Sequence, residues 1–211
     1  MKIFSDAVYL DKLHSNSLLG LGSLHQEKGE YELAYSKYKL ASKTNPNSPI
    51  VWNNLGLCFF AKKKYTAAAT CLKRAHYLDP FQWIISFNLG LVYLYSGLYS
   101  SAYIYMNAAV SLKPDIAIGY MYLGIILSKL GDITSSINSY DKSLELDNNY
   151  LTLFNYTISL ISHDMISNAK SKFSEFVKSF NNDTVEREYK DDVLELSKIV
   201  KEELRKALID S

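Results

Sequence analysis

The residues that most often perform chemistry in proteins are few and scattered in this chain of 211 residues. A metal site would need histidines or cysteines at ligand spacing, and none of the six stands at such a spacing from another. They are His14, His25, Cys58, Cys71, His76 and His163. Asp191, Asp192 and Glu195 do lie together, but in a charged stretch where a solvated helix face explains them better than a catalytic acid pair. We therefore expect no enzyme activity, no metal ion and no cofactor.

The glycines mark a repeat and not a phosphate-binding loop. Four Leu-Gly pairs recur every 34 residues, namely Leu21-Gly22, Leu55-Gly56, Leu89-Gly90 and Leu123-Gly124. Small residues keep the same interval, at Ala34, Ala68, Ala102 and Ser136 and again at Ala41, Ala75, Ala109 and Ser143. This period and spacing are the tetratricopeptide signature, two antiparallel helices per unit. The pattern predicts an all-α fold, a tetratricopeptide-repeat solenoid of antiparallel helix pairs with a C-terminal capping helix.

Each unit would use its small residues for turns and close packing. The Gly of each Leu-Gly pair lets the second helix approach closely, and the alanines of that second helix admit the next unit. Gly29, Gly97 and Gly131 fall at the turns inside the pairs, where a positive φ ends a helix without a Cβ clash. In the second repeat, Lys63 stands at this turn position.

The repeat divides the chain into three segments. Residues 1–14 match the end of a second helix, which predicts a truncated upstream repeat. Residues 15–180 hold five repeats, and the fifth is degenerate because Thr157-Ile158 replaces the Leu-Gly pair and the turn around His163-Asp164 is shortened. Residues 181–211 carry apolar residues at steps of three and four, the pattern of an amphipathic helix. We expect that helix to cap the end of the array.

Composition limits the location and the partners of the chain. Its formal net charge is +1, so no strong field favours nucleic acid. The two cysteines fall within predicted helices, which favours reduced thiols and a cytoplasmic protein. Residues 81–112 contain no charged side chain and exceed the ~20 residues that cross a bilayer. Gly97 and polar residues such as Asn88 interrupt this stretch, so we predict no transmembrane segment.

In a tetratricopeptide array, the first helix of each unit lines a groove. In the third and fourth repeats the groove positions carry mainly large apolar or aromatic side chains, among them Ile84, Phe87, Leu91, Tyr95, Met121 and Ile125. Asn54 and Asn88 align with each other on two of these helices, where an asparagine can pair with a peptide backbone. A contiguous apolar patch favours a groove for an apolar helix or extended segment of a partner. The alternative is that neighbouring side chains or the capping helix close over it.

A cluster of basic residues is the second candidate contact. It comprises Lys62, Lys63, Lys64, Lys73 and Arg74, in a unit whose only acidic residue is Asp79. One interpretation is a site for an acidic partner. The other is a solvated helix end, because lysines near a helix C-terminus also complement the helix dipole. The sequence leaves both interpretations open.

Some residues of the second and third repeats go beyond the general repeat pattern. They form the runs 52–60, 62–65, 71–75, 77–81 and 88–92, which read WNNLGLCFF, KKKY, CLKRA, YLDPF and NLGLV. These runs closely resemble the Bardet–Biedl syndrome protein 4 family, and a weaker likeness extends over about residues 15–205. The resemblance implies a subunit of the BBSome, a coat-like complex that carries membrane proteins to and from cilia.

The resemblance also implies partners and a location. The partners would be other BBSome subunits and pericentriolar or dynein–dynactin components, at the cilium base, the centrosome or pericentriolar satellites.

Two alternatives remain, an adaptor of a chaperone-associated complex and the substrate-recruiting fragment of a larger enzyme. Co-chaperone domains of this fold grip a chaperone's C-terminal carboxylate with basic residues on their first helices. Here the first helices of the first three repeats carry no Lys or Arg before their last turn, which argues against the chaperone alternative.

Overall fold

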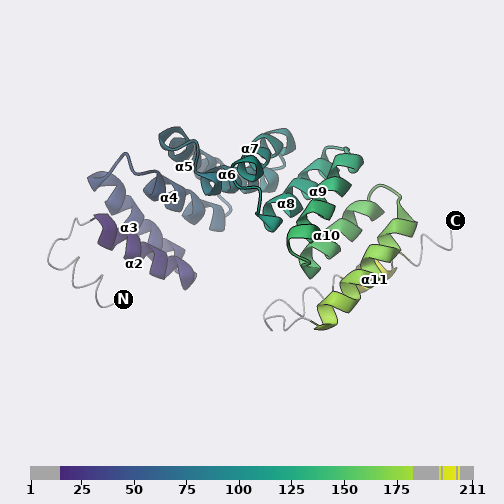
Figure 1. Cartoon of the computed structure of the whole chain (residues 1–211). Helices are drawn as coiled ribbons and strands as arrows, with labels where there is room; N and C mark the ends of the chain where they lie inside the picture. The colour runs from purple at the N-terminus through teal and green to yellow at the C-terminus, as the bar shows by residue number, and fades with distance from the viewer. Residues whose placement is uncertain (1–14, 183–194, 196, 203, 205–211) are drawn as a thin grey trace. The chain divides into compact units, whose positions relative to one another are not determined.

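A computed structural model of the chain describes residues 15–182, 195, 197–202 and 204 (Figure 1). These residues form α-helices and the turns between them, and none of them belongs to a strand. The segment 1–14, expected to be the remnant of an upstream repeat, lies outside the described residues. Over the part of the chain that the structure describes, no helix is long and apolar enough to span a membrane.

The helices follow the chain as consecutive pairs. The first unit of the structure, Met1–Pro114, contains α2 (Ser15–Glu27) with α3 (Tyr31–Thr44), α4 (Pro49–Ala61) with α5 (Tyr65–Leu78), and α6 (Trp83–Tyr95) with α7 (Tyr99–Leu112). The second unit, Asp115–Ser211, contains α8 (Ala117–Lys129) with α9 (Ile133–Leu146) and α10 (Tyr150–Ile161) with α11 (Ile166–Asn182). Within each unit, a helix packs most extensively on its own partner and less on the next pair. The charge-free stretch is thus two short helices, α6 and α7, with a turn between them.

The turn inside each of the first four pairs contains one residue in the left-handed region of φ. Gly29, Gly97 and Gly131 fill this position with φ values of 74°, 73° and 86°. The predicted role of these glycines is therefore confirmed. In the turn between α4 and α5, Lys63 adopts a φ of 57°, which costs a residue with a Cβ about 1–2 kcal/mol. The repeat geometry imposes this conformation even where the sequence lacks glycine.

The glycines of the Leu-Gly pairs allow the two helices of a pair to touch. A Cβ placed on Gly90 would lie 2.9 Å from the Met106 side chain and 3.2 Å from its backbone nitrogen. A Cβ on Gly124 would lie 2.9 Å from the ring of Tyr140. Real Cβ atoms essentially never make contacts below 3.0 Å, so either substitution would force the neighbouring side chain to move. The predicted close approach at these glycines is confirmed.

The small residues of the second helices are buried where the pairs meet. Alanines fill these positions in the first unit and have no exposed surface: Ala34, Ala41, Ala68, Ala75, Ala102 and Ala109. On α9 of the second unit, serine replaces alanine at both positions and is also fully buried. The Ser136 hydroxyl donates to the Gly124 carbonyl at 2.8 Å, and the Ser143 hydroxyl donates to the Ala117 carbonyl at 2.8 Å. Because both hydroxyls are paired, serine adds hydrogen bonds between helices without leaving a buried polar group unsatisfied.

The fifth pair leaves the 34-residue register at another place than the sequence indicated. The linker 147–149 before α10 is one residue shorter than the linker 113–116 before α8. The turn 162–165 inside the fifth pair is one residue longer than the other turns of this kind. The predicted shortening of the turn around His163-Asp164 is therefore wrong, and the missing residue precedes α10. The fold tolerates this deletion because the linker, and not a helix, absorbs it.

The earlier start of α10 changes what packs inside the fifth pair. Thr157 is fully buried, whereas Ile158 is 42% exposed, so Thr157 takes the glycine position of the other pairs. A cluster of aromatic rings fills the pair, with centroids 5.0 to 5.7 Å apart between Phe154, Phe173, Phe176 and Phe180. Most of the expected capping helix lies outside the described residues. Its described stretch 197–202 is helical, Val200 packs against the aromatic cluster, and Leu204 is only 5% exposed.

Candidate functional site

The predicted groove residues of α6 differ widely in exposure. Phe87 is only 8% exposed, Ile84 and Leu91 are half-buried, and Tyr95 is 55% exposed. The ring of Tyr95 meets that of Phe60 on α4 edge-on, with centroids 5.3 Å apart. A protein that approached this face would touch Tyr95, Leu91 and Ile84 first. Phe87 itself would offer a partner little surface.

The other two predicted apolar contact residues, Met121 and Ile125, belong to α8 and therefore to the second unit. Met121 is 6% exposed and Ile125 is half-buried, and both pack against the core around Tyr140 and Leu160. The most exposed large apolar side chain of this helix is Ile118, at 50%. On α8, as on α6, only part of the predicted set is thus accessible to a partner.

The two asparagines predicted to contact a peptide backbone belong to a chain of side-chain hydrogen bonds. The Asn88 amide nitrogen donates to the side-chain oxygen of Asn53 at 2.8 Å, and the Asn53 amide nitrogen donates to that of Asn54 at 3.0 Å. Burial raises the pKa of Tyr38, and hydrogen bonds from Ser23 and Asn54 oppose that rise. Part of the hydrogen-bonding capacity of Asn54 and Asn88 is therefore used inside the first unit. We did not anticipate the linking residue Asn53, although its place next to Asn54 was a usable signal.

Two residues of the predicted basic cluster are held by contacts inside the first unit. The Lys62 ammonium lies 2.6 Å from a carboxylate oxygen of Glu32 on α3. The Arg74 guanidinium lies 4.4 Å from the ring centroid of Trp52 and donates to the Pro46 carbonyl at 3.4 Å. An arginine stacked on an indole in this way stabilises the fold through a cation–π contact. Lys62 and Arg74 therefore have structural partners that the sequence did not reveal.

The remaining basic residues, Lys63, Lys64 and Lys73, are exposed. The Lys73 ammonium lies 5.8 Å from the ring centroid of Tyr93, and its pKa is raised by a hydrogen bond with Tyr93. Lys63 and Lys64 are exposed and form no ion pair within the described residues. The part of the cluster that could meet an acidic partner without giving up an ion pair is thus centred on the turn between α4 and α5.

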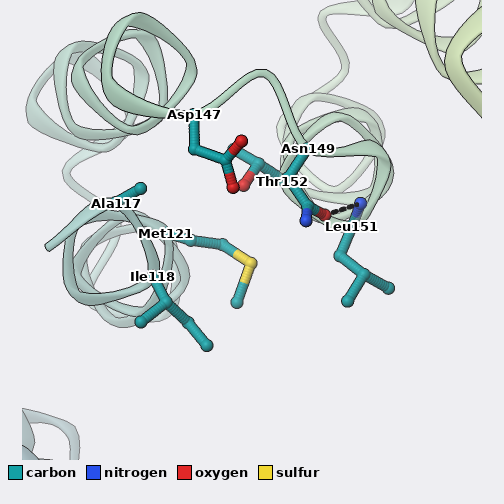
Figure 2. A pocket seen from close by; sticks show the side chains of 7 residues that line it. All are labelled: Ala117, Ile118, Met121, Asp147, Asn149, Leu151 and Thr152. Carbon is teal, nitrogen blue, oxygen red and sulfur yellow. Dashed lines mark hydrogen bonds between the residues drawn. The ribbon is translucent and has the colours of Figure 1, made fainter.

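Two hollows occupy corresponding places in the two units. One, of about 190 Å³, is lined by Pro49, Ile50, Asn53, Asp79, Gln82, Ile84 and Ile85. The other, of about 150 Å³, is lined by Ala117, Ile118, Met121, Asp147, Asn149, Leu151 and Thr152 (Figure 2). Each lies between the starts of two successive first helices, and Asp79 and Asp147 occupy the same register position. We did not single out these carboxylates from the sequence, although their shared register was the available signal.

The cysteines and histidines form no reactive centre in the described part of the chain. Cys58 and Cys71 are free, buried thiols. Burial raises the pKa of Cys58 to about 11, so this thiol stays protonated and unreactive near neutral pH. The ring of His76 packs edge-on against that of Tyr105, with centroids 5.6 Å apart. Among the described residues, no group of three or more His, Cys, Asp or Glu side chains could hold a metal ion.

Comparison with known sequences identifies the repeats and the relatives of the chain. Tetratricopeptide-repeat profiles match residues 49–82, 85–116 and 119–150. The chain is 36% identical over 166 residues to the BBSome complex member BBS4 of Mus musculus, covering 78% of this chain and 32% of the mouse protein. It is 38% identical over 172 residues to the Bos taurus protein of the same name, covering 81% and 33%. The chain thus spans about a third of the length of these relatives, and the resemblance to their family is confirmed.

Solved structures share the fold at low sequence identity. YrrB, described as a TPR protein with an unusual peptide-binding site, superposes with a TM-score of 0.70 at 16% identity, covering 85% of this chain and 93% of its own. A chain of the Cut9–Hcn1 hetero-tetramer of the APC/C superposes with a TM-score of 0.77 at 17% identity, covering 98% and 38%. At these identities the likeness concerns the fold alone. The predicted all-α tetratricopeptide-repeat solenoid is confirmed.

Proposed function

The chain is a tetratricopeptide-repeat relative of BBS4, and on this premise we propose that it is a protein–protein interaction scaffold that works as a BBSome subunit in ciliary membrane-protein trafficking. The observation that carries the proposal is the similarity to BBS4 over 78% and 81% of the chain in two mammals. Stacked helix pairs create extended surfaces for binding other proteins, which suits a scaffold. Because the match covers only about a third of each relative's length, assembly by this chain alone is itself part of the proposal.

The proposal extends to partners and to a location. The partners are other BBSome subunits, with pericentriolar or dynein–dynactin components as further contacts. The location is the cytoplasm at the cilium base, the centrosome or pericentriolar satellites. Catalysis plays no part in this function, because the chain would act by holding proteins together.

We place the main contact on the first helices of the pairs. On α6, an apolar segment of a partner would cover Ile84, Leu91 and Tyr95, since these side chains are accessible and lie along one helix. On α8, Met121 and Ile125 would contribute to the same kind of contact. Large side chains at the centre of an interface carry most of its affinity, so we expect substitution of Tyr95 to reduce the affinity most.

Two further groups would add to this contact. Asn54 and Asn88 would form hydrogen bonds with the partner's backbone. They would use the donor and acceptor positions of their side chains that are not already used in the bonds with Asn53. The exposed Lys63 and Lys64 would attract an acidic segment and raise the association rate at low salt.

Affinity purification of the tagged chain from cells of its own organism tests the proposal. We expect BBSome subunits to co-purify with the unchanged chain and to be depleted on the order of ten-fold with Tyr95→Ala, as for a central aromatic residue of an interface. Tyr77→Ala is the matched control, because Tyr77 is 84% exposed but lies on α5. Phe87→Ala is unsuitable as the first test, since Phe87 is buried and its loss would also weaken the fold.

Other outcomes would contradict the proposal. Co-purification of a chaperone without BBSome subunits would favour the chaperone-associated adaptor. Recovery of a single catalytic subunit would favour the substrate-recruiting role. Equal depletion by Tyr95→Ala and Tyr77→Ala would leave the BBSome assignment intact but refute the α6 contact.

A further inference from the structure

The hollow of the second unit has walls suited to one apolar side chain. Ile118 and Leu151 stand on opposite sides of it, 50% and 39% exposed, and Met121 lies between them at 6% exposure (Figure 2). Its volume is about 150 Å³, similar to an engineered apolar cavity that binds benzene. A leucine, isoleucine or methionine side chain of another protein is therefore of a suitable size for this hollow.

The polar groups around this hollow are not equally available. The Thr152 hydroxyl is hydrogen-bonded with that of Ser143 at 3.2 Å, and the side-chain oxygen of Asn149 accepts from the Leu151 backbone nitrogen at 2.8 Å. The carboxylate of Asp147, in contrast, is exposed and has no hydrogen bond or ion pair within the described residues. The hollow thus presents one unpaired negative charge beside its apolar walls, and none of its lining residues is cationic.

The first unit repeats this combination. Its hollow of about 190 Å³ has Ile50, 59% exposed, in the register position of Ile118, and Asp79 in that of Asp147. The Asp79 carboxylate also has no partner within the described residues. At the corresponding position of the intervening repeat stands Lys113, whose ammonium lies 4.9 Å from a tryptophan ring centroid. The unpaired carboxylate therefore accompanies both hollows and is not a feature of every repeat.

We propose that each hollow binds an aliphatic side chain of a partner segment that carries a lysine or arginine directly beside it. The aliphatic side chain fills the apolar hollow, and the cation pairs with Asp147 in the second unit or Asp79 in the first. This inference rests on the proposed function and deepens it by naming the partner's local chemistry. The occupant is fixed by charge complementarity, because an acidic neighbour would meet an unpaired carboxylate of the same sign.

Nuclear magnetic resonance titration of the isotope-labelled whole chain tests the inference with defined peptides. The probes are blocked tetrapeptides with the central pairs Leu-Arg, Leu-Glu and Gly-Arg. We expect the Leu-Arg peptide to shift the backbone amides of Ile118, Met121 and Leu151, and to bind at least on the order of three-fold more tightly than Leu-Glu, the size of an exposed ion pair. The Gly-Arg peptide lacks the apolar group and should bind more weakly than Leu-Arg.

Two variants assign the preference to the second hollow. Asp147→Asn should abolish the preference for Leu-Arg over Leu-Glu at these amides, whereas Asp164→Asn, which removes an exposed carboxylate at the other end of α10, should leave it unchanged. Ile118→Ala should weaken both leucine peptides by the same factor. Far-ultraviolet circular dichroism checks that each variant keeps its helical content.

Three results would overturn the inference. They are equal binding of the Leu-Arg and Leu-Glu peptides, shifts that miss Ile118 and Leu151, and a preference that survives in Asp147→Asn. None of them bears on whether BBSome subunits co-purify with the chain. Conversely, BBSome subunits could fail to co-purify while the preference for the Leu-Arg peptide holds. The proposed binding at the hollow is then supported and the BBSome assignment is refuted.

Discussion

The side-chain amide of Asn88 on α6 donates to the side-chain oxygen of Asn53 on α4 at 2.8 Å, and both side chains are less than 9% exposed. This bond joins two neighbouring helix pairs through a buried polar contact. Buried hydrogen bonds of this kind specify one arrangement of the helices, because a shifted pair would leave the Asn88 amide nitrogen without its acceptor and the Asn53 oxygen without its donor.

Replacing Asn53 by alanine would leave the Asn88 amide nitrogen without its acceptor. We expect Asn53→Ala to lower the free energy of unfolding by about 1–3 kcal/mol, the cost of a buried donor left unpaired. Urea denaturation followed by circular dichroism gives this value. Asn107→Ala, at an exposed position on α7, should change it by less than about 0.5 kcal/mol. Equal effects of the two substitutions would contradict the structural role of the bond.

Gly90 should not tolerate a larger side chain. Its Cβ would stand 2.9 Å from the Met106 side chain and 3.2 Å from the Met106 backbone nitrogen. We expect Gly90→Leu to destabilise the chain by about 1–3 kcal/mol or more through overpacking. Thermal unfolding monitored by circular dichroism measures the change. An unchanged melting temperature would refute the close packing of α6 on α7.

Lys63 offers the reverse test, because its backbone already has the conformation that glycine prefers. With φ at 57° and no ion pair within the described residues, Lys63→Gly should raise the free energy of unfolding by about 1 kcal/mol. Lys64→Gly is the matched control and should lower it, since Lys64 has a φ of −88° and gains nothing from glycine. A destabilised Lys63→Gly variant would show that the strain is absent.

Alkaline pH should destabilise the chain from about pH 9 upward. The folded state raises the pKa of Cys58 from its ordinary value near 9 to about 11 through burial. Between these values the unfolded chain loses the thiol proton while the folded chain retains it, so the free energy of unfolding falls as pH rises. Burial of Tyr140 raises its pKa as well and adds a loss at higher pH. Urea midpoints at pH 8 and pH 10.5 should differ less for Cys58→Ala than for the unchanged chain, and an equal difference would contradict this role of Cys58.

The repeat itself could be read from the sequence because its physical causes lie at fixed positions. Gly90 and Gly124 are required by helix contact, and this glycine recurs every 34 residues through the first four repeats. Gly97 is required by a left-handed turn, and this glycine recurs at the same interval except where Lys63 replaces it. The deletion in the fifth pair could not be located in this way. Thr157 replaces the glycine there, and without that marker a residue lost before α10 looks like one lost after it.

The candidate site was harder to predict, because side chains from different helices decide which residues are free. Lys62 and Arg74 look alike in the sequence, yet Glu32 on α3 pairs with one and Trp52 on α4 stacks on the other. Phe87 stands at a predicted groove position but is only 8% exposed, whereas Tyr95 is 55% exposed. Such assignments depend on rotamers and on neighbouring helices, which a 34-residue pattern does not encode.

We propose that this chain is a BBSome subunit, and sedimentation of the BBSome subunits of its own organism, co-expressed with and without the chain, tests this assignment. We expect the chain to sediment with the complex in stoichiometric amount and the destabilised Gly90→Leu variant to do so less. If the chain keeps its helical circular dichroism but sediments alone, while the other subunits assemble without it, the chain is not a BBSome subunit.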